Sequence, residues 1–289
     1  MMFVRTFCST DGARLAMLLG MLLALGAVPL QAQPVTPTAD NSAGPAFRIE
    51  SSLYVDGQAQ PVTRNLTTFT DQLVFDFQLD PQSGQPLDEV VIYDRRNRKL
   101  FLLDSKRKVQ LELHDVRLLK LLDGVRREAE QDQRTRFLVT DEFDEKVDAE
   151  SKRVSLSSPN MTYQFVGTAP EDDRVMPVYF EFLDQFTRLQ ASDPKKLPPF
   201  PRIRLNQSIR RVGWVPTRVD ILVKPNALFK TAFKAHTEHQ LDMGIKAEHQ
   251  SWMTRAKQNW SAFQPVSLAE YRGFATPARI ANPLKNIRR

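Results

Sequence analysis

The sequence predicts an α+β fold in which an antiparallel sheet is covered by amphipathic helices and followed by a basic helical C-terminal region. Three observations predict it. Between Phe69 and Leu113, apolar residues recur with the periodicity of strands. After that stretch, apolar residues recur at helical spacing in two separate segments. Beyond a proline-rich crossing at 194–201, basic residues greatly outnumber acidic ones.

The segment from Leu73 to Leu113 has the two-residue periodicity of β-strands. In 73–79, large apolar residues alternate with mostly polar ones, so the apolar side chains are predicted to share one face. Three further runs are rich in β-forming residues or alternate again: 89–93, 100–103 and 109–113. Asp94 and Asp104 each open a polar segment between runs and can accept hydrogen bonds from the backbone two residues on, as turns require. The segment therefore predicts an antiparallel meander.

The remaining elements follow in chain order. Further strands are predicted at 47–55, 62–69, 137–139, 154–156, 161–165, 202–206 and 215–223. One helix is predicted to begin with Asp115 as its N-cap, and a second spans 175–189 with its apolar residues on one face. The four prolines between 194 and 201 exclude a regular helix or central strand there. From Asn226 to Phe263 a long helical region is predicted, with an interruption at Gly244.

The first 32 residues have the organisation of a secretory signal peptide. Two arginines precede an apolar run from Leu15 to Val28, and the segment Pro29-Leu30-Gln31-Ala32 follows, ending in a small residue. Because the apolar run is short for a membrane span, we predict cleavage after Ala32, with an uncleaved anchor as the alternative. The single cysteine, Cys8, precedes that position, so the mature chain would carry no thiol. The sequence thus predicts an exported protein, periplasmic or secreted, with a flexible leader at 33–46.

The charge changes sign at the proline-rich crossing. Residues 33–194 contain 20 Lys and Arg against 28 Asp and Glu, whereas residues 195–289 contain 18 against 5. Two interpretations follow for the predicted basic region at 225–289, which succeeds a sheet and its helices at 47–224. It binds an anionic envelope surface, such as lipid headgroups or a cell-wall polymer, or it folds back on the acidic half. No nucleic-acid partner is expected, because the motifs of nucleic-acid folds are missing.

The sequence contains no strong catalytic or metal-binding motif. It has no cysteine after Cys8, no G-x-S-x-G elbow and no glycine-rich phosphate loop, so we expect no catalytic residue and no cofactor. His236, His239 and Asp242 are spaced three apart on a predicted helix and could reach one cation, but a solvated helix face has the same pattern. The acidic stretch 141–150 lacks the register of a calcium loop and is interpreted as a solvated hairpin. No metal site is predicted.

The order of the elements resembles that of the periplasmic lipoprotein carriers and their relatives. The residues that carry the resemblance are 73–79, 90–94, 99–104 and 109–113, with Gly213-Trp214-Val215-Pro216-Thr217-Arg218-Val219 later in the chain. The resemblance covers about 47–224. It implies a strongly curved, half-barrel-like sheet whose concave side is filled by helices around an apolar cavity that accepts acyl chains.

Three functional hypotheses follow. The first is a non-catalytic exported protein that binds a hydrophobic or lipid ligand between the sheet and its helices. The side chains expected to line that site lie on the meander: Leu73, Phe75, Phe77, Ile92, Leu102, Leu111 and Leu113. The second is an envelope interaction protein that docks on an anionic surface through its basic C-terminal half. The third is a hydrolase with a Ser–His–Asp site assembled from distant residues.

Overall fold

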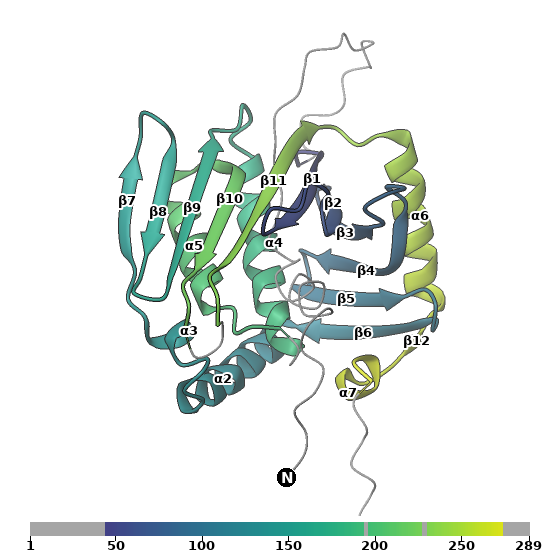
Figure 1. Ribbon diagram of the computed structural model, residues 1–289. Coiled ribbons are helices and arrows are strands. Elements are labelled where there is room, and N and C mark those ends of the chain that lie inside the picture. The colour runs from purple at the N-terminus through teal and green to yellow at the C-terminus, as the bar shows by residue number, and fades with distance from the viewer. Residues whose placement is uncertain (1–43, 194–195, 227–229, 274–289) are drawn as a thin grey trace, which may run out of the picture.

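The computed structural model of the protein describes residues 44–193, 196–226 and 230–273. Within these ranges, twelve strands form one open sheet in the order β12-β6-β5-β4-β3-β2-β1-β11-β10-β9-β8-β7 (Figure 1). Every neighbouring pair is antiparallel except β12 with β6. The α+β class and the antiparallel sheet are therefore confirmed. The predicted signal peptide at 1–32 and most of the predicted leader lie outside the described residues.

The bounds of the elements are as follows. The strands are β1 (Phe47–Val55), β2 (Thr63–Phe69), β3 (Leu73–Leu79), β4 (Pro86–Asp94), β5 (Lys99–Asp104), β6 (Val109–His114), β7 (Asp144–Asp148), β8 (Arg153–Ser157), β9 (Met161–Thr168), β10 (Val215–Val223), β11 (Phe233–Met243) and β12 (Gln264–Pro265). The helices are α2 (Asp115–Gln131), α3 (Phe137–Thr140), α4 (Val175–Leu189), η1 (Gln190–Ser192), α5 (Phe200–Val212), α6 (Ala247–Ala262) and α7 (Leu268–Tyr271).

The meander β3–β6 forms where the sequence predicts it. Its two tight turns are closed by aspartates, as expected, but each carboxylate reaches one residue further than predicted. Asp94 accepts from the backbone N–H of Asn97 at 3.0 Å, and Asp104 accepts from that of Arg107 at 2.8 Å. These turns keep the strands adjacent, so the register of the sheet is set locally in this region.

Helices cover both faces of the sheet. On one face, α2, α4 and α5 pack on an apolar cluster that extends from β6 at one side to β8 at the other. We call α2, α4 and α5 the helix layer. On the opposite face, α6 packs on a smaller cluster that belongs to β2–β5. Figure 1 shows α5 behind β9 and β10, α4 near the centre of the view beside β11, and α6 beside β3–β5. The strand direction changes markedly between β7–β10 and β4–β6.

Four secondary-structure predictions are wrong. Residues 137–139 belong to helix α3, and 202–206 belong to helix α5 rather than to strands. Asp115 is not an N-cap: His114 occupies that position, and Asp115 forms an ion pair with Arg98 at 3.0 Å. The long C-terminal helix is replaced at 233–243 by strand β11, and a helix is present only from Ala247.

Among the described residues, no helix is both long and apolar enough to cross a membrane.

The reason for the largest error is position in the sheet. Strand β11 lies between β1 and β10 and pairs with both along its length. In such a central strand, every second residue is buried by the helix layer, and Phe233, Ala235, Thr237 and His239 follow that rule. Buried Thr237 and His239 interrupt the apolar side of this alternation, so the sequence pattern does not indicate a strand, and tertiary pairing decides the structure here.

Candidate functional site

The seven residues predicted to line a ligand site do not share one face of the sheet. Leu73, Phe75, Phe77 and Ile92 belong to the cluster under α6. Leu102, Leu111 and Leu113 belong to the cluster under the helix layer. The prediction of one common surface is therefore wrong, and only the last three lie on the side where the carrier-like arrangement would place a ligand.

The register of the meander explains this division. Residues directly opposite one another in antiparallel strands point to the same face. Ile92 is opposite Phe101, whereas Leu102 is opposite Leu111, so Ile92 and Leu102 point to different faces. Because helices cover both faces of β5, its residues 100–103 are all apolar and give no indication of which one points where.

The face under α6 is closed by aromatic packing. Phe77 lies edge-on to Trp252 with ring centroids 5.9 Å apart, and Phe101 lies against Trp260 at 4.4 Å. Gln110 donates from its side-chain amide to the carbonyl groups of Trp260 and Phe263, at 3.0 and 2.7 Å. This cluster is an ordinary small core, and it holds α6 onto the meander.

The helix layer is dominated by α4. The six residues predicted to form its apolar face are all buried, which confirms that prediction: Val175, Tyr179, Phe182, Leu183, Phe186 and Leu189. Phe182 contacts Phe69 on β2 edge-on at 5.6 Å, so the helix lies over the middle of the sheet. At the rim, Glu181 accepts from the Tyr93 hydroxyl at 2.9 Å and pairs with Arg95 at 3.1 Å. These polar contacts fasten α4 to the meander.

A buried group of polar side chains lies between α5 and the sheet. Arg202, in the first turn of α5, is 3% exposed, and none of its three guanidinium nitrogens has a hydrogen-bond partner. Burial lowers the pKa of Arg202, and Tyr179 and Tyr163 act in the opposite direction. Burial also raises the pKa of both tyrosines to about 12, so their hydroxyls stay protonated.

His239 completes this group from strand β11. It is 2% exposed, and its Nε2 lies 2.5 Å from the Thr237 hydroxyl, while its Nδ1 has no partner. Burial, and secondarily the charge of Arg202, lower the pKa of His239 well below its ordinary value. The imidazole is therefore neutral at physiological pH and can donate from one nitrogen and accept at the other.

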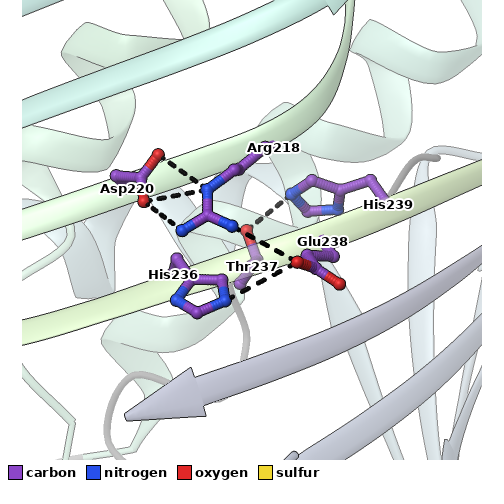
Figure 2. A network of polar contacts seen from close by, with 6 residues as sticks. All are labelled: Arg218, Asp220, His236, Thr237, Glu238 and His239. Atoms are coloured by element: carbon purple, nitrogen blue, oxygen red, sulfur yellow. Dashed lines mark hydrogen bonds and ion pairs between the residues drawn. The ribbon is translucent and has the colours of Figure 1, made fainter. Parts of the chain in front are cut away.

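A second polar network lies on the other face of β10 and β11 (Figure 2). Arg218 pairs with Asp220 at 2.8 Å and with Glu238 at 3.3 Å, and His236 lies 3.7 Å from the same carboxylate. The network borders a shallow hollow of ≈ 450 Å³. Its opposite charges are next to one another, so it presents little net charge to a ligand.

The suggested cation site at His236, His239 and Asp242 does not form. These residues belong to strand β11, where residues three apart point to opposite faces. Figure 2 shows His236 directed toward Glu238 and His239 paired with Thr237. Within the described residues, no three His, Cys, Asp or Glu side chains are grouped so that they could hold a metal ion.

Part of the basic second half of the chain pairs with acidic residues of the first half. Four of its cations form ion pairs with carboxylates of the first half: Arg210 with Asp184, Arg211 with Glu145, Lys246 with Glu50, and Arg272 with Asp193. These contacts favour the second of the two interpretations of the charge division, in which the halves neutralise each other.

Sequence reasoning did not identify Arg202, because 202–206 was assigned to a strand. A signal was present: Pro201 lies at the start of a segment in which Leu205 and Ile209 recur at helical spacing, as in a helix with proline in its first turn. The burial of an arginine on the apolar face of that helix has no signal in the sequence.

No protein-family model matches the chain, and no curated protein matches it.

Proposed function

We propose that this protein is an exported, non-catalytic binding protein for a hydrophobic or lipid ligand, held between the sheet and the helix layer. The proposal extends to a half-barrel form of the sheet, with the helix layer on its concave side, as in the periplasmic lipoprotein carriers that the sequence resembles. The change of strand direction across the sheet in Figure 1 supports this form.

The observation that carries the proposal is the way the helix layer is connected. Helix α2 lies in the link between β6 and β7, and α4 and α5 lie in the link between β9 and β10. The hydrogen bonds that pair the strands of the sheet do not involve the segments that carry these helices. A shift of the layer would leave the strand pairing intact and would open an apolar wall that includes Leu102, Leu111 and Leu113.

Wall and cover are both of the right chemistry for an acyl chain. Most buried side chains of the cover are aliphatic or aromatic, and Glu181 fastens α4 to the sheet at the rim through Tyr93 and Arg95. Replacing contacts between the helix layer and the sheet by contacts with a ligand's hydrocarbon chain costs little free energy. The dispersion and hydrophobic contributions of the two kinds of contact are similar.

Binding of an uncharged fluorescent probe, N-phenyl-1-naphthylamine, to the delipidated full chain tests the proposal. A matched pair of variants locates the site. Phe182→Leu alters the helix layer and Phe101→Leu alters the cluster under α6; each removes one buried ring. We expect saturable binding by the wild type, a several-fold change of Kd in Phe182→Leu and the wild-type Kd in Phe101→Leu. Absence of saturable binding, or an effect confined to Phe101→Leu, contradicts the proposal.

A further inference from the structure

Arg202 stands out among the buried side chains because it is a full charge without a partner. Its Nε, Nη1 and Nη2 atoms all lack hydrogen-bond partners. The exposed arginines on the same helix differ: Arg210, for example, pairs with Asp184. An arginine stays protonated under any physiological condition, so burial does not neutralise it. A core built only for packing would hold an apolar residue at this position, because an unpaired buried charge is destabilising.

The surroundings of Arg202 are polar but not anionic. The titratable groups that affect the pKa of Arg202 are the hydroxyls of Tyr179 and Tyr163, and no carboxylate of the described residues is among them. His239 acts electrostatically with Arg202 and has an unpartnered Nδ1. One turn further along α5, Asn206 donates to Thr187 at 3.0 Å, while its Oδ1 has no partner. The region thus combines one uncompensated positive charge with neutral groups able to donate or accept.

The chemistry of the guanidinium identifies the kind of group that would satisfy it. Its planar set of N–H donors binds the two oxygens of a carboxylate or of a phosphate with parallel hydrogen bonds. Neighbouring tyrosine hydroxyls can donate to the same oxygens. Beyond these polar groups, the cluster between the helix layer and the sheet is apolar, so the rest of such a molecule would be hydrocarbon.

We propose that Arg202 binds the anionic end group, carboxylate or phosphate, of an amphipathic ligand whose hydrocarbon part lies between the helix layer and the sheet. The inference rests on the proposed function and adds the class of ligand to it. Tyr163, Tyr179 and His239 complete the polar end of the site. The acyl chain extends from there along the wall under α4.

The test compares a charged and an uncharged probe with the same hydrocarbon chain and label: dansyl-labelled undecanoic acid and its methyl ester, each titrated into the delipidated full chain. Arg202→Met replaces the guanidinium by an apolar side chain of similar length. Arg204→Met, on the exposed side of the same helix, is the matched control for loss of one positive charge. Displacement of the acid probe by dodecanoate or by dodecyl phosphate distinguishes a carboxylate from a phosphate end group.

We expect the wild type and Arg204→Met to bind the acid about tenfold or more tightly than the ester, as a charge-assisted contact in a dry site would give. Arg202→Met should bind both probes with the affinity of the wild type for the ester. Retention of the acid preference in Arg202→Met, or equal binding of both probes by the wild type, overturns the inference but leaves the proposed function standing. Failure of the wild type to bind either probe contradicts the proposed function as well.

A stability measurement guards against a folding defect in the variant. Because Arg202 has no partner to lose, the ligand-free Arg202→Met protein should have a Tm at or above that of the wild type. A lower Tm would mean that Arg202 holds the fold together, and that also counts against the inference. Arg202→Lys keeps the charge without the planar donors and should retain part of the acid preference.

Discussion

Individual buried polar residues give this protein its most specific features. Arg202 lies in the helix layer and Asp76 on strand β3 of the sheet, and both are buried and ionisable. They differ in how they are satisfied. Arg202 has no partner, whereas Asp76 accepts from the Thr67 hydroxyl at 2.7 Å and from the Asn65 side-chain amide at 3.0 Å. An unpartnered group points to a ligand, and a partnered one to a structural role.

Asp76 should make stability depend on pH. Burial raises its pKa to about 6, against the opposing effect of Thr67 and Asn65; the charge of Glu89 raises it further and that of Lys196 lowers it. The folded state therefore holds the proton more tightly than the unfolded chain. The resulting stabilisation is complete below the unfolded pKa near 3.8 and is lost as the pH rises through 6.

Urea unfolding at pH 7 and pH 5 measures this effect. On acidification the wild type should gain about 1 kcal/mol relative to Asp76→Asn, which lacks the titrating group. Asp80→Asn is the control, because Asp80 follows the same strand and its pKa is lowered by hydrogen bonds from Ser83. The same pH response in wild type and Asp76→Asn would show that Asp76 does not titrate in this range.

At the scale of the elements, local chemistry predicts what tertiary pairing does not override. The meander β3–β6 and helix α4 form as expected, because alternation in the former and an unbroken apolar stripe in the latter each support one structure. Strand β11 and helix α5 were mispredicted. In β11, buried Thr237 and His239 interrupt the apolar face, and in α5, buried Arg202 and Asn206 do the same. The residues that hide these elements from sequence analysis are those that form the candidate site.

The end of α5 allows a test of local structure at two glycines. Gly213 follows the helix with φ of 69°, in the left-handed region, whereas Gly124 lies inside α2. Apart from its own chain neighbours and the adjoining helix backbone, a methyl group at either position would meet no atom within 4 Å, so the main difference is backbone preference. Gly213→Ala should lower the free energy of unfolding by about 1 kcal/mol, and Gly124→Ala should raise it by about 0.5–1 kcal/mol.

Thermal or urea unfolding of the two glycine variants gives the comparison directly. Changes of the same sign in both proteins would contradict the assignment of Gly213 as the residue that ends α5. The result matters for the site, because α5 carries Arg202 and Asn206 and leads straight into β10.

At the scale of the whole molecule, the two faces of the sheet have different roles. The face under α6 is a closed core in which Trp252 and Trp260 pack on the rings of the meander. The other face carries a larger cluster, a cover made of two chain links, and the buried polar group around Arg202. From the sequence, an apolar sheet with helical covers could be predicted. The sequence does not predict which side chains face the helix layer and which face α6, because strands buried on both faces have no alternation of apolar and polar residues.

The central claim is that ligand enters between the helix layer and the sheet, and hydrogen–deuterium exchange of the full chain with and without dodecanoate tests it most directly. Helices α4 and α5 carry the predicted site, and α6, on the opposite face of the same sheet, is an internal control. We predict that saturating dodecanoate slows amide exchange in α4 and α5 and leaves exchange in α6 unchanged. Protection confined to α6, or saturable binding without protection of α4 and α5, would contradict the claim.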